Sequence, residues 1–259
     1  MKSLLSLLTF GLFAVTAVAA DKPDTRLFEM RVYYAKPGKL DALNARFRDH
    51  TTALFTRHGM TNLGYFVPID NQENKLVYFL AFPDRASRDA SFKAFGADPD
   101  WKAAAKDSEK DGKLIERIDN VFLTATDYAV LAEAKSFGKG VFELRTYTTE
   151  AGRLDNLNAR FRDHTLKLFA KHGMTSMTYW NLAVDQKGAR NAYVAGNTLI
   201  YLLHHRSAQA AKASFGAFRS DPSWLAAKGA SEERAGGSLT IKEGVKSEFL
   251  TPTDYSFVK

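Results

Sequence analysis

Hydrophobic and polar positions along the chain change their period several times, from two residues to three or four and back. Residues 27–34 alternate, with Phe28, Met30 and Val32 on one face and Glu29 and Arg31 on the other, which predicts a strand. Apolar positions then follow helical spacing over residues 39–58. The pattern continues with predicted strands at 61–69, 75–82 and 113–125 and predicted helices at 83–95 and 98–111.

The same order of elements occurs a second time in the chain. The segment LNARFRDHT stands at residues 43–51 and again at 157–165, which is 114 residues further on (157 − 43). The second copy predicts strands at 141–148, 174–183, 198–205 and 247–250 and helices at 153–172, 207–218 and from 220 onward. After a longer hairpin at 184–197, the offset between equivalent residues grows to 123 (215 − 92). A tandem duplication explains this, with repeats at 26–128 and 140–256 and a linker at 129–139.

Each repeat therefore reads βαββαβ, the order of a ferredoxin-like unit. Helices cover one face of such a sheet and leave the other face open. Two open faces in one chain can close on each other. The sequence thus predicts an α+β fold in which two tandem ferredoxin-like repeats pack sheet to sheet as an intramolecular dimeric α/β barrel.

Residues 1–20 differ from the rest of the chain. Lys2 precedes an apolar run at 4–15, and small residues follow at 17–20, which is the pattern of a secretory signal peptide. We therefore expect a protein exported to the periplasm or the medium, with no transmembrane segment in the mature chain. The chain has no cysteine, so disulfides and thiol-based sites are excluded. The net charge is +7, but the basic residues are scattered among acidic ones and form no basic tract. No motif for nucleic-acid binding occurs.

Several short motifs of both repeats resemble the NIPSNAP family. These are the FELRTY-type strand, the PGKL or AGRL turn, the RFRDHT helix ending in HGM, and the DP-x-W segment. The resemblance covers almost all of the chain after residue 20, twice over. It implies a ferredoxin-like barrel of the dimeric α/β-barrel superfamily. It implies no established reaction, because related barrels include monooxygenases, haem-degrading enzymes and lactone isomerases.

The polar faces of the two first strands form the first candidate site. If their apolar faces pack on the helices, the polar side chains point into the barrel interior and could bind a small anionic or aromatic molecule. The carboxylates would then be candidate catalytic bases. The alternative is a structural network of paired charges. The residues concerned are Glu29, Arg31, Tyr33, Glu143, Arg145 and Tyr147.

Two histidines form the second candidate. His50 and His164 fall on the apolar stripe of each first helix, so either they are catalytic or they are packed and hydrogen-bonded. His58 and His172 lie eight residues further on, about 12 Å along the helix axis, so neither pair can hold one metal ion. Tyr179 and Trp180 on a second-repeat strand are further candidate ligand contacts.

These observations predict an exported barrel that binds a small molecule in its interior, without metal or cofactor. Two alternatives remain open at this stage. One is a cofactor-independent monooxygenase or isomerase using Glu29 or Glu143, and the other is a structural or protein-interaction module, which could form homo-oligomers. Walker, GxGxxG, HExxH and GxSxG motifs do not occur in the sequence.

Overall fold

A computed structural model of the chain describes residues 24–129, 137–186 and 195–258. The predicted signal peptide and the greater part of the linker and of the 184–197 hairpin lie outside these residues. The elements of the first half are β1 (Leu27–Ala35), α1 (Leu40–Arg46), η1 (Phe47–Thr51), α2 (Thr52–Arg57), β2 (Thr61–Pro68), β3 (Lys75–Phe82), α3 (Arg85–Ala97), α4 (Pro99–Ser108) and β4 (Ile115–Ala125). Those of the second half are β5 (Val141–Thr149), α5 (Leu154–Arg160), η2 (Phe161–Thr165), α6 (Leu166–Lys171), β6 (Thr175–Leu182), β7 (Thr198–His205), α7 (Ala208–Ser220), α8 (Pro222–Arg234) and β8 (Thr240–Pro252).

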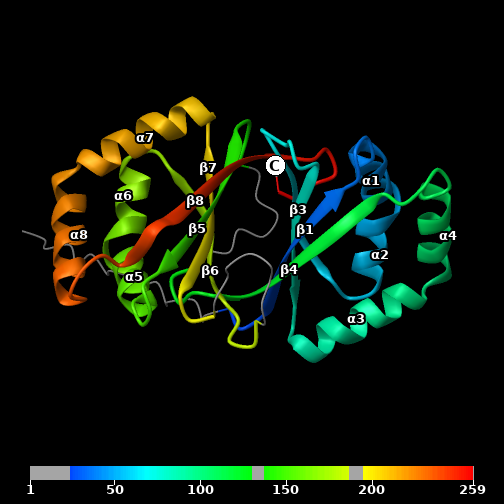
Figure 1. Cartoon of the computed structure of the whole chain (residues 1–259), viewed down its shortest axis with the longest axis horizontal. Helices are drawn as coiled ribbons and strands as arrows, with labels where there is room; N and C mark the ends of the chain where they lie inside the picture. Colours follow the sequence, from blue (N-terminus) through cyan, green and yellow to red (C-terminus); the bar gives the residue numbers. More distant parts are fainter. Residues whose placement is uncertain (1–23, 130–136, 187–194, 259) are drawn as a thin grey trace, which may run out of the picture.

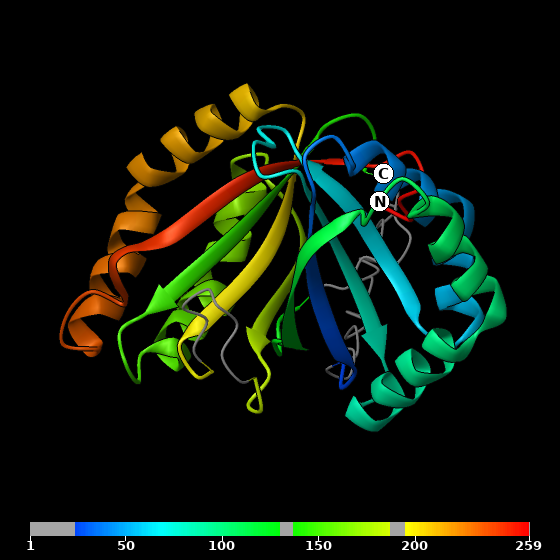
Figure 2. The same cartoon turned by 45° about the vertical axis from the view of Figure 1, so that its right-hand side comes forward.

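The strands form one closed barrel in the order β1-β3-β2-β8-β5-β7-β6-β4. Each half contributes four neighbouring strands, and the halves meet where β2 pairs with β8 and β4 pairs with β6. The helices of the first half cover one side of the barrel and those of the second half cover the other (Figures 1 and 2). The predicted fold, two ferredoxin-like repeats closed sheet to sheet, is confirmed.

The inside of the barrel is lined by apolar side chains from both halves. Phe28, Met30 and Val32 of β1 belong to this inner cluster, and the indole of Trp180 stacks on Phe79 across the halves at 5.1 Å between ring centroids. Full burial of such side chains stabilises a fold by about 1.5–3 kcal/mol each. The apolar face of β1 therefore points inward, and the prediction that the polar face lines the interior is wrong.

The helices pack on the outer face of each sheet. In the first half, Phe47, Leu54 and Phe55 contact a second cluster that includes Tyr78 of β3. The long first helix is interrupted by the π-helical turn η1, and η2 interrupts its copy. In η1 the hydroxyl of Thr51 donates to the carbonyl of Arg46, five residues earlier, at 3.1 Å.

This turn corrects the prediction for the two histidines. An extra residue in one turn rotates everything after it by about a quarter of a turn or more, since an α-helix has 3.6 residues per turn. The buried stripe therefore continues through Thr51 and Thr165, while His50 and His164 are exposed. Neither histidine is packed in the core, and neither lies in the barrel.

The other two histidines join helices to each other. His58 Nε2 lies 2.7 Å from Asp98 Oδ2, and His172 Nε2 lies 2.8 Å from Asp221 Oδ2. Asp98 and Asp221 are the N-caps of α4 and α8 and accept from backbone N–H groups there. Each contact thus ties the end of a first helix to the start of a last helix.

Strand β8 is longer than the prediction of residues 247–250. It begins at Thr240, and residues 241–247 are exposed apart from Gly244, with the apolar Ile241 and Val245 exposed like the Lys and Glu side chains between them, so no alternation is visible. Its pairing with β5 shifts register between Tyr147 and Thr149, and Glu243 has a φ of 58°. An irregular, solvent-facing strand gives little periodic signal.

Candidate functional site

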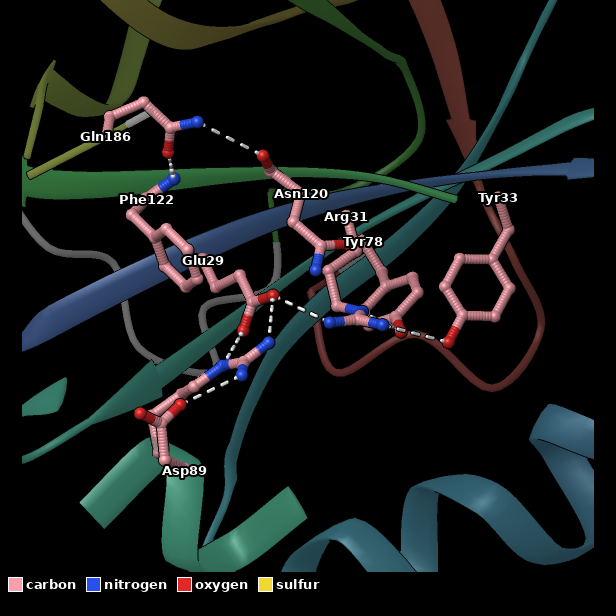
Figure 3. A network of polar contacts seen from close by, with 9 residues as sticks. Glu29, Arg31, Tyr33, Tyr78, Asp89, Asn120, Phe122 and Gln186 are labelled. Atoms are coloured by element: carbon pink, nitrogen blue, oxygen red, sulfur yellow. Dashed lines mark hydrogen bonds and ion pairs between the residues drawn. The ribbon is translucent and has the colours of Figure 1, made fainter. Parts of the chain in front are cut away.

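A buried network of charged and phenolic groups lies between the sheet and the helices of the first half (Figure 3). Arg31 is its centre and donates to Glu29 Oε1 at 2.6 Å, to the hydroxyl of Tyr78 at 2.8 Å and to that of Tyr33 at 3.3 Å. Arg88 of α3 donates to both oxygens of Glu29 at 2.9 Å. One carboxylate therefore sits between two guanidinium groups.

Burial and pairing act in opposite directions on these groups. Burial alone disfavours the charge of Arg31, but Tyr33, Tyr78 and Glu29 outweigh it and hold the pKa of Arg31 well above its usual value. Burial raises the pKa of Tyr78, so this phenol keeps its proton. The guanidinium also lies 4.7 Å from the centre of the Phe92 ring. The network is thus a fixed ion pair with two phenols around it.

The second half contains the same network with one change. Arg145 donates to Glu143 Oε1 at 2.5 Å, to Tyr201 at 2.9 Å and to Tyr147 at 3.3 Å. The position of Arg88 is taken by Ala211, 123 residues further on. His205 of β7 lies at the other oxygen of Glu143 instead, with Nε2 at 3.0 Å from Oε2. A histidine has therefore replaced an arginine as the second partner of the carboxylate.

The structure separates the six predicted site residues into two groups. Glu29, Arg31 and Tyr33 lie under the helices of the first half, and their counterparts lie under those of the second half, with the barrel between them. In both groups every carboxylate oxygen and both phenols have a partner. Buried groups that satisfy one another fit the structural alternative better than an open binding site.

Four members of the networks were missed from the sequence. Tyr78 and Tyr201 stand 123 residues apart on equivalent strands, so their repetition was a usable signal. Arg88 and His205 have no counterpart of the same type in the other half. Only the three-dimensional placement of α3 and β7 reveals their role.

The remaining two candidates lie on opposite faces of β6. Tyr179 belongs to the helix side, where it stacks on Tyr201 at 5.1 Å and its hydroxyl lies 2.6 Å from Ser176 Oγ. Trp180 faces the barrel interior, next to Phe28 and Phe79. Tyr179 thus packs against Tyr201 of the second network. Of the predicted ligand contacts, Trp180 alone lies inside the barrel.

The interior face of the second half carries polar atoms that have no partner. They are the indole nitrogen of Trp180, the hydroxyl of Thr178 and Nε2 of His204. All three residues are buried, with exposed fractions of 1%, 2% and 6%. Thr178 and Trp180 stand opposite Leu202 and Ile200 of β7, and His204 is two residues beyond Leu202 on the same face. Burial lowers the pKa of His204, so its imidazole is neutral near pH 7.

Within the part of the chain that the structure describes, no group of three or more His, Asp or Glu side chains is placed to hold a metal ion. None of the helices described is both long and apolar enough to span a bilayer.

We expect the first network to stabilise the fold. Replacing Glu29 by Gln leaves the buried guanidinium of Arg31 without a counter-charge and Arg88 with only the exposed Asp89, so the free energy of unfolding should fall by about 3–5 kcal/mol. Asp89→Asn is the matched control, because Asp89 also pairs with Arg88 but is exposed, and it should cost less than about 0.5 kcal/mol. Urea unfolding of both variants measures the difference, and equal stability of Glu29→Gln and the parent would contradict a structural role.

The second network should make stability depend on acid. Burial acts to raise the pKa of Glu143, but hydrogen bonds from His205 and Arg145 and the charge of Arg145 prevail and lower it below 4.5. The unfolded chain binds this proton at a higher pH than the folded chain does. The stabilisation that the Glu143 carboxylate contributes is therefore fully present above pH 4.5, the ordinary pKa of a glutamate. It is lost as the pH falls toward the lower pKa of Glu143 in the folded protein.

Unfolding free energies measured at several pH values between neutral and acid would show this dependence. The loss on acidification should be smaller in Glu143→Gln than in the parent, whereas Glu233→Gln, at an exposed position of α8, should leave the profile unchanged. Identical profiles for Glu143→Gln and the parent would rule out this source of acid sensitivity.

Comparisons with solved structures support the fold. A proposed monooxygenase from Lactobacillus acidophilus NCFM is 11% identical and has a TM-score of 0.53, with 88% of this chain and 94% of that chain covered. An anthrone oxidase-like protein is 13% identical, with a TM-score of 0.56 and coverage of 91% and 94%. At these identities the likeness concerns the fold alone.

Matches within the family cover single repeats. A NIPSNAP domain protein from Burkholderia xenovorans is 25% identical over 39% of this chain and 94% of its own, with a TM-score of 0.34. A search of curated proteins gave no match. The NIPSNAP family model matches this chain twice, at residues 28–130 and 142–257, which together span most of its length. The chain is a member of the NIPSNAP family that carries two copies of the family's domain.

Proposed function

We propose that this NIPSNAP protein is exported and binds one small, mostly apolar molecule against the interior face of its second half. The unpartnered polar atoms of Thr178, Trp180 and His204 carry this proposal. Buried polar groups in native proteins almost always have a hydrogen-bond partner, and leaving one without a partner costs about 1–3 kcal/mol. A ligand with polar groups at matching positions would supply the missing partners.

The side chains around these atoms indicate the chemistry of the ligand. The indole of Trp180 can only donate, the hydroxyl of Thr178 can donate or accept, and a neutral imidazole offers one donor and one acceptor. Positions 200 and 204 of β7 are about 13 Å apart along the strand, since a strand rises about 3.3 Å per residue. An elongated molecule with a carbonyl or hydroxyl group fits this row, and its apolar body would contact Phe28 and Phe79.

The interior side chains would have to adjust to admit such a molecule. Met30 and Met177 lie in the inner cluster, and methionine is the apolar side chain that adapts its shape most easily. Met177 also stands at an irregularity in the pairing of β6 with β7, between Ser176 and Thr178. The second half therefore has a place where packing can change without breaking the regular ladder.

The first half shows what this face looks like without polar atoms. Gly64, Phe66 and Ala81 occupy the positions equivalent to Thr178, Trp180 and His204, at offsets of 114 for the first two and 123 for the third. None of these three side chains carries a polar atom. The two halves thus differ at these positions, apolar in one and hydrogen-bonding in the other, which supports a specific role for the second half.

Export is the second part of the proposal and rests on the signal-like pattern of residues 1–20. We expect N-terminal sequencing of the protein from its producing cells to give a start near Asp21. Mature protein that begins at Met1 would contradict cleavage and leave the binding proposal intact.

Native mass spectrometry of protein purified under mild conditions should show an added mass that is lost on denaturation. The variants Trp180→Phe and His204→Ala install the residues of the first half, and each should reduce retention of this mass at least about tenfold, because one hydrogen bond inside the barrel is lost. Trp224→Phe is the control, since it removes an indole that packs at a tilt against Phe218 in the helix layer. A bare mass in every preparation, or equal retention in all variants, would overturn the proposal and favour buried water at these atoms.

A further inference from the structure

Equivalent grooves on the outer surface of the two halves have opposite charge. In the first half a cavity of about 460 Å³ lies between the first helix and α4. Three acids line it, Asp49, Asp100 and Asp107, together with His50 and Arg57. Arg57 donates to Asp100 at 2.7 Å and is largely engaged by it. This groove is acidic.

In the second half the corresponding groove consists of two adjoining cavities between the first helix and α8. The wider one is about 420 Å³ and is lined by Lys167 and Lys171, and the smaller one is about 30 Å³ and is lined by Arg160 and Arg234. Both are lined by Asp163 and His164, so they lie side by side. We call this surface the α6–α8 groove.

Among the positions that line either groove, the replacements that alter charge all make the second groove more positive. Lys167 stands where the first half has Ala53, and Arg234 stands where it has Asp111. Two acids of the first groove, Asp100 and Asp107, correspond to Ser223 and Ala230. The histidine and the buried arginine of the first helix are kept in both. The two grooves therefore share the buried arginine and the histidine and differ in the charge of the side chains around them.

That arginine is poorly compensated in the second half. Arg160 is 6% exposed, and its nearest carboxylate oxygen, from Glu232, is 3.8 Å from Nη1. Its Nε has no partner, and neither has Nε of Arg46 in the first half, so the distance to the carboxylate is what differs. Glu232 instead accepts a hydrogen bond from Nζ of Lys228 at 2.8 Å. The hydroxyl of Ser231 accepts from Nη1 at 3.3 Å, which is a long contact.

The first half shows the compensated form of the same side chain. Nη1 of Arg46 lies 3.1 Å from Glu109, the residue equivalent to Glu232. Both arginines lie over a tryptophan ring, at 5.2 Å for Trp101 and 5.1 Å for Trp224. Burial lowers the pKa of Arg160, and Glu232 only partly opposes this. A buried cation with a distant counter-charge is stabilised by an anion from solution.

We propose that the α6–α8 groove binds a small soluble oxyanion, with a phosphate or carboxylate group seated on Arg160 and Arg234 and the rest of the molecule over Lys167. The smaller cavity admits little more than one or two waters, so one or two oxygens of such a group would enter it beside Arg160 while the rest of the group lies outside it. Planar guanidinium groups are well matched to these oxyanions. Asp163, which corresponds to Asp49 of the first groove, would lie at the edge of the bound anion.

Thermal unfolding of the full mature protein in inorganic phosphate, at ionic strength held constant with sodium chloride, tests this site. We expect a saturable rise in Tm, since a ligand that binds only the folded state stabilises it. Arg234→Asp installs the first-half residue at an exposed position, so it should fold normally and weaken phosphate binding at least about tenfold. Ser223→Asp should weaken it in the same direction through like charge.

Arg219→Asp is the matched control, because it makes the same change of charge on the exposed surface of α7, outside the groove. It should bind phosphate like the parent. Titration with acetate separates a carboxylate site from a phosphate site. The proposal is overturned if the parent gains no more from phosphate or acetate than from chloride, or if Arg234→Asp and Arg219→Asp lose affinity equally, which would indicate a nonspecific effect of net charge.

Discussion

Closure of the two sheets on each other is the constraint from which the rest of the structure follows. A four-stranded sheet with helices on one face leaves its other face exposed to water, and here that face carries Phe28, Met30 and Val32 in one half and Phe142 and Leu144 in the other. Packing these faces together removes them from water, and the edge pairings of β2 with β8 and β4 with β6 remove the free sheet edges. Neither half can bury this surface alone.

Closure also decides where the charged side chains lie. Because the apolar face of β1 and β5 is used inside the barrel, alternation forces Glu29, Arg31 and their counterparts under the helices. Charges at such positions are tolerated when they pair and when their remaining hydrogen-bonding groups are satisfied. The phenols of Tyr78 and Tyr201 complete this by accepting from the arginine Nε in each half. The conspicuous polar pattern of the first strands is therefore explained by the needs of folding.

The sequence allowed the duplication, the βαββαβ order and the barrel to be predicted, because a repeated period and a repeated segment are local signals. The face of β1 that enters the barrel could not be derived in the same way. Both faces carry large side chains, and Tyr33 with Arg31 forms as bulky a surface as Phe28 with Met30, so periodicity alone gives no direction. His50 was placed on the wrong face because the π-helical turn at Phe47–Thr51 adds a residue that an ideal helical projection does not contain.

Comparison of the two halves separates the features that both share from those that one half has alone. The Arg–Glu–Tyr–Tyr network, the π-helical turns and the histidine–aspartate contacts occur in both halves, so each serves packing that both halves share. Three orphaned polar atoms inside the barrel and an arginine with a distant counter-charge on the outer surface occur in the second half. A buried polar group without a partner reduces stability, and a fold can retain it where binding returns that free energy. The second half carries both kinds of group on a frame that the first half builds without them, and this contrast is the reason for proposing that recognition belongs to the second half.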